Sequence, residues 1–183
     1  MIKGYRRINL FAGSGAGKST TAAYIFAKLK EEQFTIELIN EYVKAWAHQG
    51  RKPTSFDQIY LFGKQVHMED RVLRNGVDFI VTDSPIALSP MYAAKYCSPA
   101  MSDHLWSLSH LIDMKYPPIN IFLRRKDRFF KQQGRFENLE QAKEMDTFIY
   151  DQLCSRGMDF IEWDSQDRDN LFHYIKGQLH ATV

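Results

Sequence analysis

The feature that most constrains the fold is a run of small residues, Ala-Gly-Ser-Gly-Ala-Gly-Lys-Ser-Thr, at positions 12–20. It follows a short apolar run at 8–12 and overlaps the start of a segment, 20–30, whose apolar residues have helical spacing. Clustered glycines between two such segments predict a tight turn where a strand ends and a helix begins. The chain is therefore expected to open with a strand–loop–helix unit.

The remainder of the chain continues to alternate between strand and helix. Further strands are predicted at 35–39, 77–82, 119–123 and 160–163. Helices are predicted at 41–48, from a Ser55 cap to the stop at Gly76, at 87–96, at 102–115, from an Asn138 cap to Leu153, and at 171–179. Strands separated by helices imply right-handed crossovers and a parallel sheet covered on both faces. We expect a three-layer α/β fold with about five parallel strands flanked by helices.

Length and composition fit a single globular domain that spans residues 1–183. Hydrophobic residues make up 44% of the chain, which excludes wholesale disorder, and the formal charge is only +2. No apolar run approaches the roughly 18 residues of a membrane span. The two cysteines have neither disulfide-framework nor metal-ligand spacing. These features predict a cytoplasmic protein without a membrane partner, and they leave a homodimer open.

The small residues of the first loop also match a phosphate-binding pattern. The pattern G-x-x-x-x-G-K-[ST] is fulfilled except at its first position, which is Ala12. In this setting backbone N–H groups converge on a polyphosphate, a lysine neutralises the phosphates and a hydroxyl binds Mg²⁺. Lys18 is therefore expected on the β- and γ-phosphates of ATP, and Ser19 on Mg²⁺. The expected nucleotide-binding residues are Gly13, Ser14, Gly15, Ala16, Gly17, Lys18, Ser19 and Thr20.

Other classes of nucleotide-binding protein fit less well. A GTPase needs an Asp-x-x-Gly switch, which Asp83-Ser84-Pro85-Ile86 lacks, and an Asn/Thr-Lys-x-Asp base reader, which does not occur. A motor ATPase usually needs a longer chain with sensor elements. Small size and an Arg-rich segment after the fourth strand favour a phosphoryl-transfer kinase.

Two acidic residues follow predicted strands, where ligands of parallel sheets are bound. Asp83 ends the third strand and is a candidate for binding Mg²⁺ or for taking a proton from an acceptor hydroxyl. Glu41 follows the second strand and is a candidate for the same base. Ordinary roles compete, because Asp-Ser-Pro is good turn chemistry and a helix N-terminus favours Glu. The sequence does not decide which of the two acids is the base.

The most basic stretch of the chain, at about 124–136, is expected to be a short lid. A kinase lid places arginine on the transferring phosphate, and Arg125, Arg128 and Arg135 are the candidates. A solvated basic loop is the competing interpretation. The helix around 55–75 and the stretch 85–115 are expected to wall the acceptor pocket.

The chain resembles a known family, the small P-loop kinases related to ribosylnicotinamide kinase, which has many phage-encoded members. The resemblance runs over about residues 6–165. It rests on residues 11–20, Asn40-Glu41-Tyr42-Val43-Lys44-Ala45-Trp46, Thr82-Asp83-Ser84-Pro85, and Gly134-Arg135-Phe136 ahead of the helix from Ala142 to Asp146. It implies a P-loop kinase fold, the use of ATP and Mg²⁺, and a host cytoplasmic location if the chain is phage-encoded. The resemblance also reaches phage kinases that phosphorylate 5-hydroxymethyluracil in DNA.

Three functions therefore remain open from the sequence. The first is a kinase of a free nucleoside or nucleotide, and the second is a kinase of a hydroxymethylated base within DNA. Two basic–aromatic segments bear on the second: Phe129 and Phe130 within the lid, and the stretch from Lys44 to Lys52 that includes Trp46. The third is a nucleotide-binding ATPase or regulator without an acceptor.

Overall fold

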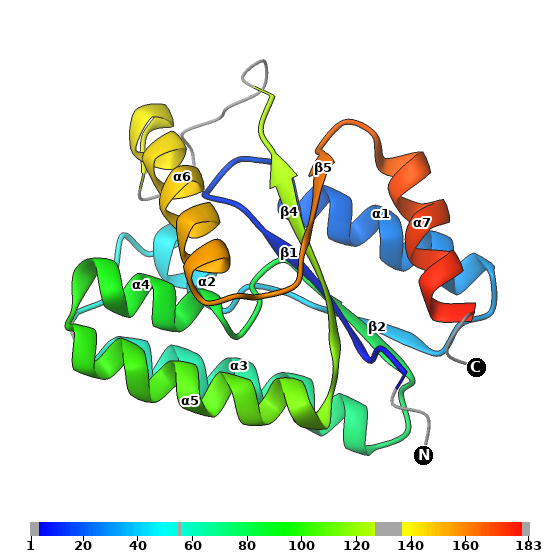
Figure 1. Cartoon of the computed structure of the whole chain (residues 1–183), viewed down its shortest axis with the longest axis horizontal. Coiled ribbons are helices and arrows are strands. Elements are labelled where there is room, and N and C mark those ends of the chain that lie inside the picture. Colours follow the sequence, from blue (N-terminus) through cyan, green and yellow to red (C-terminus); the bar gives the residue numbers. More distant parts are fainter. Residues whose placement is uncertain (1–3, 55, 127–136, 181–183) are drawn as a thin grey trace.

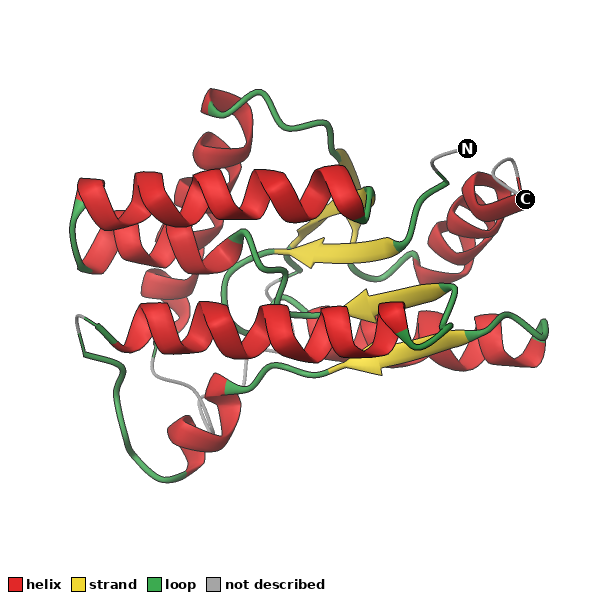
Figure 2. Cartoon of the chain, turned by 90° about the horizontal axis from the view of Figure 1, so that it is seen from below, coloured by secondary structure: helices red, strands yellow, loops and turns green. Residues whose placement is uncertain are grey.

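The centre of the molecule is one sheet of five parallel strands in the order β2-β3-β1-β4-β5. The computed structural model describes residues 4–54, 56–126 and 137–180. The strands are β1 (Arg7–Phe11), β2 (Ile36–Ile39), β3 (Phe79–Thr82), β4 (Pro118–Arg124) and β5 (Ile161–Asp164). Figure 2 shows the strands pointing in one direction, so their carboxyl ends meet at one edge.

Helices cover both faces of this sheet, as Figure 1 shows. α1 (Lys18–Glu31) and α7 (Arg168–His180) pack on one face. The opposite side carries α3 (Asp57–Arg74), α4 (Leu88–Tyr96), α5 (Pro99–Lys115) and α6 (Leu139–Ser155). The short helix α2 (Val43–His48) follows β2. The expected three-layer α/β fold is therefore confirmed.

The strands are nearly continuous apolar runs in the sequence because most of their side chains are buried. β1, the central strand, is buried at all five positions, because helices cover it on both faces. Ile8 and Leu10 join the core under α1 and α7, whereas Phe11 joins a second core under α4 and α6. Among the described residues, no helix is long and apolar enough to cross a membrane.

Helix ends follow the sequence where a cap is present. Asn138 caps α6 as predicted: its side chain accepts from the backbone N–H of Gln141, whose own side chain accepts from that of Asn138. α5 begins at Pro99, three residues before the predicted start. The reason is that Ser98 accepts from the N–H of Met101 while Pro99 fits the first helical position. The predicted cap of α3, Ser55, lies outside the described residues.

Candidate active site

The loop between β1 and α1 has the backbone that a phosphate-binding loop requires. Gly15 and Gly17 have φ angles of +76° and +98°, a region that side chains with a Cβ rarely adopt. Ala12, at the first position of the pattern, has no positive φ. An alanine therefore fits there without strain, and the departure from the pattern leaves the loop intact.

Gly13 is required for a different reason, which is close packing against α6. A Cβ at this position would lie 2.5 Å from the carbonyl oxygen of Ala142 and 2.9 Å from Oδ1 of Asp146. The Gly13 N–H donates to Asp146 Oδ1 over 2.5 Å. Gly13 is thus the point where the loop contacts α6.

Lys18 lies at the start of α1 with its ammonium group folded onto the loop. Its Nζ donates to the carbonyl oxygens of Ala12 at 2.7 Å and Gly13 at 2.9 Å. Burial lowers the pKa of Lys18 from its ordinary value, and the nearby carboxylates of Glu41 and Asp83 act in the opposite direction. The lysine is therefore a half-buried cation with carboxylates near it.

The two candidate acids meet because β2 and β3 are neighbours. Ile39 pairs with Thr82, so Glu41 and Asp83 both lie just past the ends of paired strands. The Glu41 N–H donates to Asp83 Oδ1 over 3.1 Å. Glu41 lines the cavity described next, whereas Asp83 is buried beside it, with 3% of its surface exposed. Burial raises the pKa of Glu41 above its ordinary value of 4.5, and the Lys18 cation opposes this shift.

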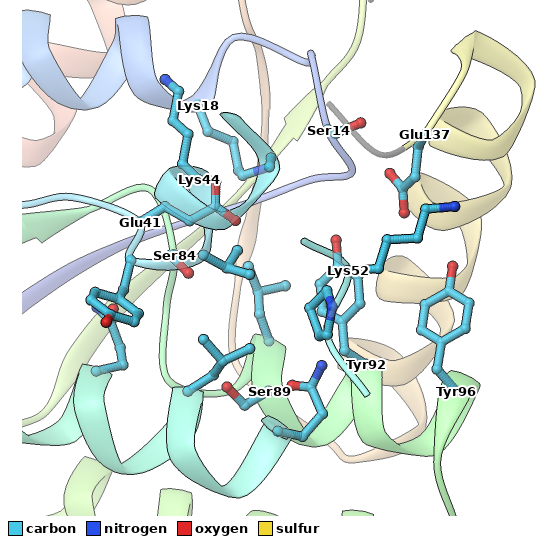
Figure 3. Close-up of a pocket in the computed structure, with 18 of the residues that line it drawn as sticks. Ser14, Lys18, Glu41, Lys44, Lys52, Ser84, Ser89, Tyr92, Tyr96 and Glu137 are labelled. Carbon is cyan, nitrogen blue, oxygen red and sulfur yellow. The ribbon is translucent and has the colours of Figure 1, made fainter. Parts of the chain in front are cut away.

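A cavity of about 590 Å³ runs from the phosphate loop to α3 and α4. Figure 3 shows Lys18, Glu41 and Ser84 toward one end, with Tyr92, Tyr96 and Glu137 at the other. α3 contributes Gln58, Leu61 and Gln65, and α4 contributes Leu88, Ser89, Tyr92 and Tyr96. α3 and the segment after β3, which we predicted to wall the acceptor pocket, line this cavity as far as Cys97, and the binding of an acceptor there stays a prediction. α5 was included in that wall, but it packs behind α4 and lines no part of this cavity.

The predicted phosphate-loop residues divide between this cavity and the core. Gly13 and Ala16 are buried behind the loop. The others line the cavity: Ser14, Gly15, Gly17, Lys18, Ser19 and Thr20.

Arg125, the first candidate lid arginine, faces the phosphate loop and α6. Its Nε donates to Asp146 Oδ2 over 2.6 Å, and its NH2 donates to the carbonyl oxygen of Ser14 over 2.8 Å. Only 6% of the Arg125 side chain is exposed. Arg128 and Arg135, with most of the predicted lid, lie outside the described residues.

The second basic–aromatic segment is largely packed. Trp46 is buried, with the Arg51 guanidinium 3.6 Å from its ring centroid and the Tyr60 ring stacked nearly parallel at 6.0 Å. Lys44 and Lys52 are exposed and line the cavity. The lysines can therefore meet an anion, whereas Trp46 already has both a cation and a ring against it.

A buried polar network lies beneath the cavity. Gln65 donates to Glu69 at 2.8 Å and to Thr82 at 3.3 Å. Glu69 pairs with Arg7 at 2.8 Å, and Arg7 also pairs with Asp113 at 2.5 Å. The Gln65 amide nitrogen thus contacts two buried partners, and the residue also lines the cavity.

The hydroxyl and carboxylate oxygens near the phosphate loop could hold Mg²⁺ only together with the phosphates of a nucleotide. Ser19 and Glu41 line the cavity, and the Asp83 carboxylate is buried beside Glu41. Within the described part of the chain, no group of three or more His, Cys, Asp or Glu could hold a metal by itself. Mg²⁺ is commonly bound through one or two carboxylates, waters and substrate phosphates. The donor set fits that mode.

Several cavity and loop contacts could not be inferred residue by residue. Asp146 entered the sequence analysis only as part of the helix from Ala142 to Asp146, and nothing in the sequence indicates that its carboxylate contacts Gly13. Tyr92 and Gln58 lie within predicted helices, and helical spacing does not distinguish a residue that lines a cavity from one packed in the core. For Tyr92 the sequence indicated only that it lies in a helix after the third strand, within the stretch expected to wall the acceptor pocket.

Comparison with solved structures supports the fold. The NadR protein in complex with NR superposes with a TM-score of 0.70 at 12% identity, over 97% of this chain and 50% of that one. This chain thus spans about half the length of NadR. Deoxyadenosine kinase from M. mycoides with bound dATP gives a TM-score of 0.59 at 19% identity, over 95% and 99% of the chains. APS kinase CysC from Mycobacterium tuberculosis with AMPPNP and APS gives 0.51 at 12% identity, over 96% and 98%.

These likenesses establish a P-loop kinase fold. No protein with a curated description matches the sequence. A family model described as an AAA domain matches residues 7–170. That match covers β1, the phosphate loop, both candidate acids and the whole sheet, and we conclude that the chain belongs to this AAA-domain family of P-loop proteins.

Proposed function

We propose that the chain, as one domain, is an ATP- and Mg²⁺-dependent kinase that transfers the γ-phosphate to a hydroxyl of a nucleoside-type acceptor. The observation that carries this proposal is one continuous cavity with the phosphate loop at one end and a wall of tyrosine, glutamine and leucine at the other. A nucleotide-binding loop alone would not need the second wall. The neighbours of the same fold include kinases of deoxyadenosine and APS.

The residues divide the reaction between them. The N–H groups of the loop and the Lys18 ammonium group bind the phosphates of ATP, and Ser19 and Asp83 are suited to hold Mg²⁺, which neutralises phosphate charge when bound. Glu41 lines the cavity beside Lys18 and is placed to take a proton from the acceptor hydroxyl, with Asp83 as the alternative base. In this proposal Arg125, Arg128 and Arg135 cover the transferring group, and Arg125 contacts the loop through Ser14.

A DNA base is a second candidate acceptor. Lys44 and Lys52 are exposed at the cavity, where they could contact a phosphate backbone. A phage 5-hydroxymethyluracil DNA kinase would use the same phosphate loop. The packing of Trp46 removes one aromatic that this hypothesis counted on for stacking.

A third candidate is an ATPase or regulator without an acceptor. Membership of an AAA-domain family is the observation in its favour. For each candidate a cytoplasmic location is in keeping with two cysteines that form no disulfide, Cys97 and Cys154. If the chain is phage-encoded, that compartment is the host cytoplasm.

One assay separates the three candidates. ATP consumption is measured without acceptor, with a nucleoside panel that includes ribosylnicotinamide, and with DNA that contains 5-hydroxymethyluracil. Stimulation by a nucleoside supports the main proposal. Stimulation by the DNA, lost steeply as salt rises, supports the second. Fast consumption that no acceptor increases would contradict both kinase proposals.

A further inference from the structure

The carboxylate of Asp146 joins three parts of the molecule that are distant in the sequence. It accepts the Gly13 N–H at 2.5 Å and the Arg125 Nε at 2.6 Å. Arg125 completes the ring of contacts by donating to the Ser14 carbonyl at 2.8 Å. α6, the end of β4 and the phosphate loop are thereby tied together through one side chain.

The ring is largely removed from water, which strengthens it. The side chains of Arg125 and Asp146 are 6% and 16% exposed, so their attraction is screened far less than that of a surface pair. α6 also presses directly on the loop, because Gly13 has no room for a Cβ against Ala142. Asp146 therefore acts at a place where the backbone has little freedom to shift.

These contacts fix the direction of peptide groups in the loop. A trans peptide directs its carbonyl and its N–H oppositely, so a carbonyl held on one side places the following N–H on the other. Lys18 holds the carbonyls of Ala12 and Gly13, and Arg125 holds that of Ser14. The N–H of Gly15 is then turned away from Arg125, and Gly15 lines the cavity.

We propose that Asp146 is a positioning residue for nucleotide binding: by anchoring Gly13 and Arg125 together, it holds the phosphate loop so that the Gly15 N–H is turned away from Arg125 and toward the cavity that Gly15 lines. This inference rests on the proposed function, because it takes ATP as the ligand of the loop. Asp146 contacts no substrate in this role. It acts through the backbone of Gly13 and through the guanidinium of Arg125.

The test compares ATP binding by four proteins in the presence of Mg²⁺, measured by titration calorimetry: wild type, D146A, D146N and the control D103N. Asp103 also pairs with an arginine, Arg156 at the end of α6, but on the surface and away from the loop. D146A is expected to lose roughly tenfold to a hundredfold in ATP affinity, since small misplacements of a positioned group have large effects. D146N keeps an acceptor for Gly13 but loses the charge, so its loss is smaller. D103N binds as wild type does.

A double-mutant cycle distinguishes positioning from general destabilisation. If Asp146 works through Arg125, the losses of ATP affinity in D146N and R125Q do not add in the double variant. A merely structural role would lower the melting temperature while leaving the ATP dissociation constant unchanged. If D146A fails to fold, D146N and the cycle decide the matter.

The results distinguish a failure of this inference from a failure of the proposed function. Folded D146A and D146N proteins that bind ATP as tightly as wild type, or losses that add fully in the cycle, overturn this inference alone. A wild-type protein that binds no ATP overturns the proposed function and this inference with it.

Discussion

Lys18 and Glu41 show how far single side chains here depart from their behaviour in water. The lysine is half-buried and donates to two carbonyl oxygens of its own loop. Glu41 is half-buried near it, and each charge offsets part of the effect of desolvation on the pKa of the other. Such mutual dependence means that removing either charge also changes the protonation of its neighbour.

Replacing Lys18 tests the phosphate loop at the residue scale. K18A is expected to reduce phosphoryl transfer by about 10²–10³-fold, because one preorganised donor to developing charge contributes that much. ATP turnover and circular dichroism are measured on the same preparations. K28A is the control, since Lys28 lies on the same helix and pairs only with exposed Glu31. Turnover near that of wild type in a folded K18A protein would refute the assigned role.

The two candidate bases are distinguished by comparing E41Q with D83N. The variant that removes the base loses about 10²–10⁴ in kcat with little change in ATP affinity. If Glu41 is the base, it must be deprotonated, and burial raises its pKa. Activity is then lost, as pH falls, through a value above 4.5, and E41Q loses this acidic limb. An unchanged pH–rate profile in E41Q points to Asp83 instead.

At the scale of elements, the contact between the phosphate loop and α6 determines which glycine can be replaced. G13A places a Cβ 2.5 Å from the Ala142 carbonyl, so the loop or α6 must shift. We expect a loss of roughly 1–3 kcal/mol in the free energy of unfolding, as for other overpacked sites, and weaker ATP binding. Urea unfolding and calorimetry measure the two effects.

Gly63 supplies the matched control for that substitution. It is an exposed position of α3 with nothing within 4 Å of an added Cβ. G63A is expected to stabilise the protein by roughly 0.5–1 kcal/mol, because alanine favours a helix interior over glycine. A G13A protein as stable as G63A, with wild-type ATP binding, would show that α6 does not press on the loop as described.

Elements were predictable where their signals are local. Short apolar runs between helical segments identified all five strands, and Asn138 marked the start of α6. The parallel arrangement also explains why Glu41 and Asp83, far apart in sequence, could both be expected at one edge. Asp146 and Gln65 could not be identified in this way, because their roles depend on residues more than ten positions away. Tertiary contacts of that kind leave no periodic trace in a single sequence.

At the scale of the whole molecule, stability depends on an ion pair beneath the cavity. Arg7 and Glu69 are each about 1% exposed, and Asp113 adds a second carboxylate to Arg7. A buried pair is expensive to desolvate and more expensive to break. The network is therefore a sensitive measure of whether β1, α3 and α5 are packed as described.

Removing one partner of that pair should be more harmful than removing both. E69A leaves Arg7 with less compensation and is expected to lower the free energy of unfolding by about 3–5 kcal/mol. The double variant R7M/E69L replaces the charges with apolar groups and is expected to recover most of that loss. Urea unfolding measures both proteins. A double variant no more stable than E69A would contradict this account.

The cavity that joins the phosphate loop to α3 and α4 also has a consequence for chemical probes. One continuous space of about 590 Å³ is lined by the phosphate loop and by α3 and α4. A molecule that links a polyphosphate to a ring system can therefore contact the loop and the two helices at once. Tethering makes the second contact intramolecular, so such a conjugate gains in avidity over its separate halves when the linker matches the span. The length of the best linker would measure, in solution, how far apart donor and acceptor are held.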